Sequence, residues 1–414
     1  MRSYLLILCT ILTLVGCKKD DDDSPQHFDR TVLIYIAGEN NLAPYINEEL
    51  REMVRGSYGI GNNALVVYVD GTDDRPYIMR LAEGEKQNVH TLESDGFSSD
   101  PDVMREVLNY TAANYPADDY GLVLWGHATG WEIEDSTYVP SSKRAYGIDN
   151  GGNTTSNTGR WMNMYTLAQT LKAWGQPLRF ILADCCQFQC VESAYELRNA
   201  TDYIIGSPAE IPGIGAPYDQ LGKAFFSKDE HFYESIVDEY FEQVTGDGSQ
   251  RTPLSVIKTS KLDTLAFATE KALKTFLPLA DGTYPKMDGL LYYRGNTSDN
   301  KASTMYDMND FMLHYTDSAA YANWKKVFDQ TVIYRKHPDP SKDETWMTNH
   351  QIKDIVFTYV TDERYGGISM FVPQDRTGSW YQPFTKNGVK HDGYNADIKK
   401  TSWYWAAGLD DLGW

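Results

Sequence analysis

The sequence predicts an α/β protein with a mostly parallel central sheet, helices on both faces of that sheet, and a C-terminal α+β region. Two observations lead to this prediction. Short β-rich segments alternate with segments of helical pattern through the first half of the chain. These β-rich segments are almost continuously apolar, as strands buried on both faces are. The second half is less regular and dense in aromatic residues, so we expect a mixed region there.

The elements of the first half follow one another as strand and helix in turn. Apolar runs predict strands at residues 31–37, 64–70, 120–125, 178–183 and 203–206. Helical patterns lie between them, near residues 42–54, 100–114, 164–174 and 191–198. The second of these helices has the clearest start, because Asp100 suits the N-cap and Pro101 the first turn.

The second half predicts two further helices, at residues 233–243 and 262–276, and a strand at 368–372. A polar, glycine-containing stretch at residues 246–251 marks the best candidate for a boundary. We therefore expect one domain over residues 30–250, which carries the site, and a C-terminal region over 251–414 that packs on it. The chain is long enough for one large or two ordinary domains.

The N-terminus has the pattern of an exported lipoprotein. Arg2 precedes an apolar run at residues 4–15, which is shorter than the roughly 20 residues of a membrane-spanning helix and suits a signal peptide. Gly16 before Cys17 resembles the bacterial lipobox, so we expect residues 1–17 to be a signal peptide with Cys17 lipidated. An ordinary signal peptide with an incidental cysteine is the alternative.

An acidic tether is expected to follow at residues 18–29. The run of four aspartates at 20–23 repels itself and cannot bury surface, so this segment should be solvated. Its position resembles the acidic export signal of Bacteroidota lipoproteins. This resemblance implies an outer-membrane or cell-surface lipoprotein that contacts the membrane through its lipid alone.

Composition narrows the functional classes. A net charge of −20 makes nucleic acid an unfavourable partner and is compatible with basic peptide substrates. Three of the five cysteines, Cys185, Cys186 and Cys190, lie within six positions, which is a poor disulfide framework for a large exported protein. A local chemical role is therefore expected, with burial as small apolar residues as the alternative.

The predicted topology brings a histidine and a cysteine together. In parallel sheets, ligands bind at the carboxyl ends of the strands. His127 follows the strand at 120–125 and Cys186 follows the strand at 178–183, so both reach one edge if these strands are neighbours. A predicted helix soon after Cys186 would favour its thiolate, and the histidine could act as acid or base.

The residues around this pair resemble the clostripain family of cysteine peptidases. Residues 124–131 (LWGHATGW) resemble its histidine motif WGHGSGW, and residues 184–195 (DCCQFQCVESAY) resemble DACLMGSVEVAY. Further family-like segments follow in the expected order over most of residues 31 to 410, at 35–42, 207–218, 305–311 and 367–373. This resemblance implies a caspase-like α/β/α sandwich and a cysteine endopeptidase with basic specificity.

The resemblance also implies roles for individual residues. Cys186 would be the nucleophile and His127 its partner, with the backbone N–H groups of Ala128 and Cys186 as the oxyanion hole. Asp184 would line the S1 pocket for Arg or Lys, and the alternative is that it caps the following helix. Maturation would cut after Lys143-Arg144. The chemistry needs no cofactor, and calcium dependence is known in the family, although no acidic cluster in the sequence marks a dedicated site.

Two departures from the family pattern bear on activity. Ala128 replaces a glycine, and its methyl group would be strained if the position required a positive φ. Cys185 replaces an alanine and adds a second thiol beside the nucleophile.

Three other functional interpretations stay open. A cysteine–metal site lacks the paired spacing of metal ligands. The 10 Trp and 29 Tyr suit a glycan-binding surface lipoprotein. A degenerate peptidase would bind peptides without cleaving them.

Overall fold

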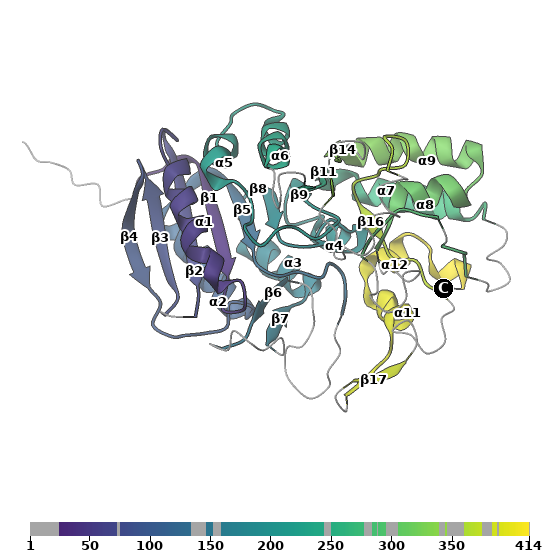
Figure 1. Ribbon diagram of the computed structural model, residues 1–414, viewed down its shortest axis with the longest axis horizontal. Helices are drawn as coiled ribbons and strands as arrows, with labels where there is room; N and C mark the ends of the chain where they lie inside the picture. Colours follow the sequence, from purple (N-terminus) through teal and green to yellow (C-terminus); the bar gives the residue numbers. More distant parts are fainter. Residues whose placement is uncertain are drawn as a thin grey trace, which may run out of the picture.

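The computed structural model (Figure 1) describes residues 25–72, 75–133, 146–151, 159–243, 250–276, 284–287, 289–294, 305–338, 344–345, 360–374, 383–386 and 389–413. The predicted signal peptide, Cys17 and most of the tether lie outside the described residues, as do Lys143 and Arg144. Among the described residues, no helix is both long and apolar enough to cross a bilayer.

A nine-stranded sheet forms the centre of the molecule, in the order β14-β11-β9-β8-β5-β1-β2-β3-β4. Its middle strands run parallel to one another, and they are β1 (Phe28–Ala37), β2 (Asn63–Asp70), β5 (Ala117–Trp125), β8 (Leu178–Asp184) and β9 (Tyr203–Gly206). These are the five strands expected from the apolar runs. The prediction of a mostly parallel central sheet is therefore confirmed.

Antiparallel strands that we did not predict extend both edges of this sheet. On one side lie β3 (Tyr77–Ala82) and β4 (Glu85–Thr91), and β4 is almost entirely exposed and polar, so it lacks an apolar run. On the other side lie β11 (Leu254–Lys258) and β14 (Val332–Lys336). The sheet thus contains strands from both sides of the boundary expected near residue 250.

Helices cover both faces of the sheet, which gives the expected α/β/α sandwich (Figure 1). Along β1, Val32, Ile34 and Ile36 belong to one core, whereas Leu33 and Tyr35 belong to the other. The first core is completed by α1 (Ala43–Gly56), α5 (Tyr218–Phe225) and α6 (Phe232–Glu242). The second is completed by α2 (Pro101–Asn114), α3 (Met164–Trp174), α4 (Val191–Leu197) and α7 (Leu262–Leu273).

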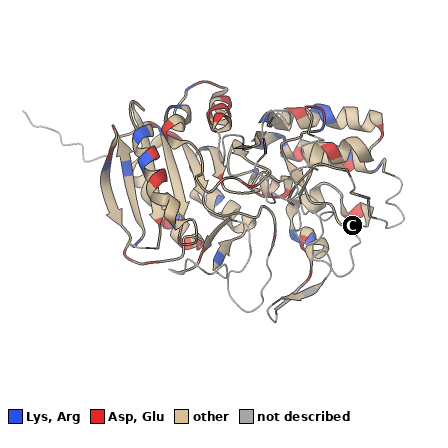
Figure 2. Ribbon diagram, viewed as in Figure 1, with Lys and Arg blue, Asp and Glu red and all other residues tan. Residues whose placement is uncertain are grey.

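Charged residues are interspersed over the helices, and the parallel strands carry theirs mainly near the ends (Figure 2). Asp70 is the last residue of β2 and Asp184 the last residue of β8. Both are buried. The carboxyl edge of the sheet therefore has buried acids at its strand ends, and this is the edge where a parallel sheet binds ligands.

The C-terminal region contributes residues such as Phe311, Trp324 and Trp403 to the second core, and it reaches the carboxyl edge of the sheet through β16 (Ser369–Met370), a shortened form of the strand expected at 368–372. The Ser369 N–H donates to the Gln189 carbonyl at 3.0 Å. The remaining strands and α-helices among the described residues are short, apart from two helices. They are β6 (Tyr146–Asp149), β7 (Arg160–Met162), β10 (Gln250–Arg251), β12 (Tyr292–Arg294), β13 (Met305–Asp307), α8 (Met308–Tyr315), α9 (Ser318–Thr331), β15 (Glu344–Thr345), β17 (Phe384–Lys386), β18 (Val389–His391), α11 (Tyr394–Asp397) and α12 (Ser402–Ala406).

Candidate active site

The loops that carry His127 and Cys186 leave the sheet side by side. β5 and β8 are parallel neighbours, with Trp125 opposite Asp184 in the register. The Gly126 N–H donates to the Asp184 carbonyl at 3.4 Å, which holds the two loops together where they begin. The inference that these strands are adjacent is confirmed, and both predicted residues lie at the carboxyl edge.

A hydrogen bond from another loop orients the His127 ring. Its Nε2 lies 2.6 Å from Oδ1 of Asn41, in the loop between β1 and α1. An amide oxygen only accepts, so Nε2 carries the proton and Nδ1 of the neutral ring is left as an acceptor. Burial lowers the pKa of His127, which favours this neutral form. The sequence analysis gave Asn41 no role, because this contact joins residues that are distant in the chain.

The three clustered cysteines differ in exposure. Cys185 and Cys190 are fully buried, whereas Cys186 is partly exposed, and none of the three forms a disulfide. Burial raises the pKa of Cys185 and of Cys190 well above the ordinary value for a thiol. The Cys190 thiol also donates to Oγ of Ser193 at 3.0 Å. Among the described cysteines, Cys186 is the one that an external peptide can reach, and Cys185 does not compete with it.

The helix predicted near residues 191–198 is present as α4, but the inference that its dipole would favour the Cys186 thiolate is wrong. Helix α4 begins at Val191 with Cys190 as its N-cap, so Cys186 lies four residues before the N-cap. The effect of a helix dipole is confined to the end of the helix and is weak at that position. The Cys186 sulfur instead faces the backbone of Ile211: it accepts from the Ile211 N–H at 3.5 Å, and the thiol donates to the Ile211 carbonyl at 3.9 Å. The N–H favours negative charge on sulfur, whereas the carbonyl favours the protonated thiol.

The turn that holds Cys186 is fixed by its following residues. Gln187 has a positive φ of 56°, which is uncommon for a residue other than glycine, and its N–H donates to the Ala209 carbonyl at 2.8 Å. The buried Gln189 amide donates to Ile204 and Ser255 carbonyls at 3.2 and 2.9 Å. These bonds join the turn to β9 and β11, so the position of Cys186 is set by the sheet.

Ala128 occupies its position without backbone strain. Ala128 is not among the residues with positive φ, so its methyl group causes no backbone strain. Ala128 forms an isolated antiparallel bridge with Tyr146, and the Gly147 N–H donates to the His127 carbonyl at 2.8 Å. The backbone after His127 is therefore held by β6.

Asp184 is buried and accepts three hydrogen bonds. Tyr218 and Tyr240 donate their hydroxyls at 2.7 and 2.8 Å, and the Ala216 N–H donates at 3.0 Å. Burial raises the pKa of Asp184 against the effect of these donors. None of the three donors belongs to α4, whose N-cap is Cys190. The alternative that Asp184 caps the following helix is therefore wrong.

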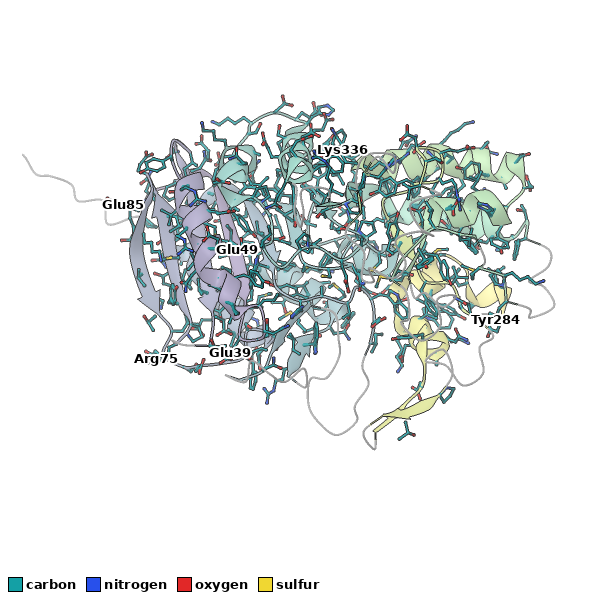
Figure 3. All side chains as sticks on the ribbon, viewed as in Figure 1. Glu39, Glu49, Arg75, Glu85, Tyr284 and Lys336 are labelled. Carbon is teal, nitrogen blue, oxygen red and sulfur yellow. The ribbon has the colours of Figure 1, made fainter. Side chains whose placement is uncertain are left out.

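A second carboxylate lies beside Asp184. Glu49 on α1 (Figure 3) is buried, and its Oε2 has no hydrogen-bond partner. Burial raises the pKa of Glu49 to about 10, and the nearby Asp184 adds to the shift. A Cβ on Gly215, which has a φ of 63°, would lie 2.7 Å from Asp184 Oδ2 and 3.0 Å from Glu49 Oε1. Only glycine therefore lets the loop contact both acids.

Three further acids meet at the same edge of the sheet. Glu39, Asp70 and Asp149 are all buried, and each offers a carboxylate oxygen within 4.8 Å of the others. Burial raises the pKa of Asp70 to about 9, and the charge of Asp149 contributes next. The sequence analysis assigned no metal ligands, because these residues come from three separate segments of the chain.

Comparisons with known proteins agree with this fold. The model of the clostripain family matches residues 34–405. A secreted C11 cysteine protease from Bacteroides thetaiotaomicron, solved with an irreversible peptide inhibitor, is 28% identical, with a TM-score of 0.71 over 92% of this chain and 99% of that chain. An inactive zymogen C11 protease from Parabacteroides distasonis is 25% identical, with a TM-score of 0.70 over 92% of this chain and 99% of that one.

Clostripain from Hathewaya histolytica is 22% identical over 219 residues, and the match covers 46% of this chain. The match spans 41% of that relative. The family match, by contrast, extends over most of this chain, and the structural relatives share the caspase-like sandwich along almost their whole length. The chain belongs to the clostripain family of cysteine peptidases.

Proposed function

We propose that this peptidase cleaves peptide bonds after Arg or Lys, with Cys186 as nucleophile and His127 as general acid and base. One observation carries the proposal: the partly exposed thiol lies two residues after Asp184, a buried carboxylate with Glu49 at its side. Two buried acids with no basic side chain among their hydrogen-bond donors favour a substrate that brings its own cation.

The proposed chemistry uses the orientation of His127. Nδ1 of the neutral ring takes the Cys186 proton while the sulfur attacks the scissile carbonyl carbon. The N–H groups of Ala128 and Cys186 donate to the oxyanion of the tetrahedral intermediate. His127 then returns the proton to the leaving amine as the C–N bond breaks, and water hydrolyses the thioester by the reverse sequence. Asn41 holds Nε2 throughout, so that Nδ1 faces the reacting groups.

Basic specificity rests on charge pairing in the S1 pocket. A guanidinium can bind a carboxylate through two parallel hydrogen bonds, and an ammonium binds it as a point charge. In the free enzyme, Glu49 is held neutral by its raised pKa, and an arriving cation would favour its ionised form. The pocket would then carry two negative charges only while substrate is bound.

The test is hydrolysis of fluorogenic peptides that end in Arg, Lys, Asp or Ala by reduced protein lacking residues 1–24. Cys186→Ala and Cys185→Ala are the matched pair of variants. We expect cleavage after Arg and Lys, its loss in Cys186→Ala, and its retention in Cys185→Ala. The thiols must be reduced and the maturation cut must be present in this assay. If the protein then binds these peptides without cleaving them, the result would instead support a degenerate peptidase.

We propose that maturation cuts the Arg144–Ala145 bond. Tyr146, the second residue after this bond, pairs with Ala128, so a cut there would act close to the segment that holds the backbone after His127. N-terminal sequencing of the active enzyme tests this. An intact bond in fully active protein would exclude it.

We also propose that the protein is exported and anchored at the cell surface by lipid on Cys17. The signal-peptide pattern and acidic tether support this, and the structural relative from B. thetaiotaomicron is described as secreted. Metabolic labelling with an alkyne fatty acid should mark the wild-type protein and leave Cys17→Ser unlabelled. Protease shaving of intact cells should remove the protein, and full resistance would contradict surface exposure.

A further inference from the structure

We propose that a pocket beside α4 binds the ammonium group of a lysine side chain or of a free alkylamine. The pocket has a volume of about 270 Å³ and lies between the loop after His127, the first turns of α3 and α4, and the residues just before α12. Helix α4 lies beside both α3 and α12 (Figure 1). A lysine in a peptide substrate is one source of the ammonium group, and that part of the proposal rests on the proposed function.

The walls of the pocket combine apolar and acidic side chains. Trp131, Ile133 and Met164 supply apolar surface, against which the methylene stem of a lysine can pack. Glu192 and Glu196, one turn apart on α4, supply two carboxylates. An ammonium group pairs with carboxylates as a compact charge with three donors. This lining therefore favours an aliphatic cation over an anion.

Glu192 is the residue that points to a ligand. Its side chain is fully buried, and its Oε1 accepts from the Phe371 N–H at 2.7 Å. Its Oε2 has no hydrogen-bond partner among the described residues. A buried carboxylate oxygen without a donor is costly, and a bound ammonium would supply the donor. Burial also raises the pKa of Glu192 to about 7, and an arriving cation would favour the ionised form.

The other charged groups in the wall already have partners. Glu196 accepts from the Ser402 N–H at 2.7 Å and from the Ser402 hydroxyl at 3.0 Å. Lys400 donates to Asp397, which lies outside the wall, at 2.9 Å. The Lys400 ammonium is therefore held away from Glu192, which remains the acid for a ligand to pair with. Glu196 can contribute as well, because each carboxylate oxygen can accept more than one hydrogen bond.

This pocket and the pocket at Asp184 lie on opposite faces of the sheet. Trp131 and Met164 belong to the core that α3 and α4 complete, whereas Tyr218 and Tyr240, which donate to Asp184, belong to the other core. The two catalytic loops leave the sheet between these faces, at the ends of β5 and β8. A peptide with one basic residue at Asp184 can therefore extend across the catalytic edge and place a second basic residue in this pocket.

The binding test uses n-butylamine, which has the shape and charge of a lysine side chain, and protein lacking residues 1–24. The protein carries Asp184→Asn, so that the proposed specificity pocket does not bind the probe. The melting temperature should rise by several degrees relative to NaCl of equal ionic strength, because a ligand of the folded chain stabilises it. Ligand-observed NMR should show saturable binding of n-butylamine and none of n-butanol. Neither readout requires peptidase activity.

Variants assign this binding to the pocket. Glu192→Gln, added to Asp184→Asn, should abolish both the shift and the NMR signal, and Glu196→Gln should weaken them. Asp202→Asn is the matched control, because Asp202 is an exposed acid paired with Arg179, and it should keep both. If the Glu192 variant does not fold, the Glu196 variant decides the question.

Peptide kinetics identify the source of the ammonium group. Internally quenched peptides carry Arg at the cleavage site and a second residue, Lys or the neutral norleucine, moved along both sides of it. At one position, Lys should raise kcat/KM by about tenfold or more, as a charge-assisted hydrogen bond does. This gain should disappear in Glu192→Gln, whose hydrolysis of the norleucine peptides should be unchanged.

The outcomes separate this proposal from the proposed specificity. Saturable n-butylamine binding without a gain at any peptide position would assign the pocket to a free alkylamine. Failure to cleave any Arg peptide would contradict the proposed function and leave the binding result standing. A melting temperature that n-butylamine raises no more than NaCl does, or equally with and without Glu192→Gln, would overturn the proposal.

Discussion

Two groups of buried acids lie at the carboxyl edge of the sheet, and one of them includes a near neighbour of Cys186 in the chain. Asp184 accepts from two tyrosine hydroxyls and a backbone N–H, and Glu49 beside it is held neutral. Glu39, Asp70 and Asp149 form the second group, where Asp70 has an oxygen with no donor. Each group has one buried oxygen without a hydrogen-bond donor, Glu49 Oε2 in the first and Asp70 Oδ1 in the second. The two groups therefore differ mainly in their place, because the first contains Asp184, which lies two residues before Cys186.

The comparison predicts that the first group, Asp184 and Glu49, binds the charge of the substrate and that the second group does not. Replacing Asp184 by Asn should lower kcat/KM for Arg and Lys peptides by about 100-fold or more, since losing one partner of a buried charge pair costs about 2–5 kcal/mol. Hydrolysis of a peptide with a neutral residue at the same position should change little. Steady-state kinetics on both peptides measure this, with Asp202→Asn as control. An equal loss on both would assign Asp184 a structural role only.

Asn41 lies in the loop between Glu39 of the second group and Glu49 of the first. Its substitution tests whether this loop orients the His127 ring. Asn41→Ala removes the acceptor for His127 Nε2, and a hydrogen bond to a group that becomes charged is worth about 1.5–3 kcal/mol, or roughly 10- to 100-fold in kcat. Asn41→Asp keeps an acceptor and should retain more activity than Asn41→Ala. Similar activity in the two variants would show that the 2.6 Å contact does not orient the ring.

Replacing Glu49 tests whether Glu49 and Asp184 bind the substrate cation together. Glu49→Gln resembles the neutral form that the raised pKa favours, so the melting temperature should not fall. We expect kcat/KM for Arg peptides to decrease by about tenfold, which corresponds to about 1.4 kcal/mol of lost charge pairing. Calorimetry and kinetics on the same preparation give both values. A stable variant with unchanged kinetics would leave Asp184 as the sole specificity residue.

Glu192 is a buried acid that belongs to neither group, and burial is the main cause of its raised pKa. It accepts from the Phe371 N–H at 2.7 Å, and burial raises its pKa to about 7 from 4.5. The folded chain therefore holds a proton that the unfolded chain releases. Its contribution to stability is present below pH 4.5 and is lost as the pH rises towards 7.

Glu192→Gln should remove this loss. Its melting temperature should exceed that of the wild type by a few degrees at pH 8, where the proton released by Glu192 costs the wild type about 3 kcal/mol, and the difference should shrink at pH 4.5. Thermal unfolding at the two pH values provides the measurement. A difference that does not vary with pH would show that Glu192 is charged over the whole range.

Much of the fold could be predicted, because its five central strands are buried on both faces and read as apolar runs. Their order also placed His127 and Cys186 at the ends of what proved to be neighbouring strands. β4 was missed because its residues are polar and exposed. β11 and β14 were missed because they join the sheet after a long excursion of the chain.

The supporting residues of the site were less predictable. Asn41, Glu49 and the cluster around Asp70 act through contacts between distant segments, which no local pattern reports. The start of α4 was predicted near residue 191, but the turn that separates it from Cys186 was not weighed. Gln187 has a positive φ without being glycine, so its turn has no sequence signature.

The most direct test of the account is covalent labelling with an irreversible peptide inhibitor that ends in Arg, followed by peptide mapping by mass spectrometry. The account predicts one adduct, on the partly exposed Cys186, and none on the buried Cys185 or Cys190. Labelling should disappear in Cys186→Ala and weaken in Asp184→Asn. An adduct on Cys185, or no adduct on fully reduced and matured protein, would contradict the assignment of the nucleophile.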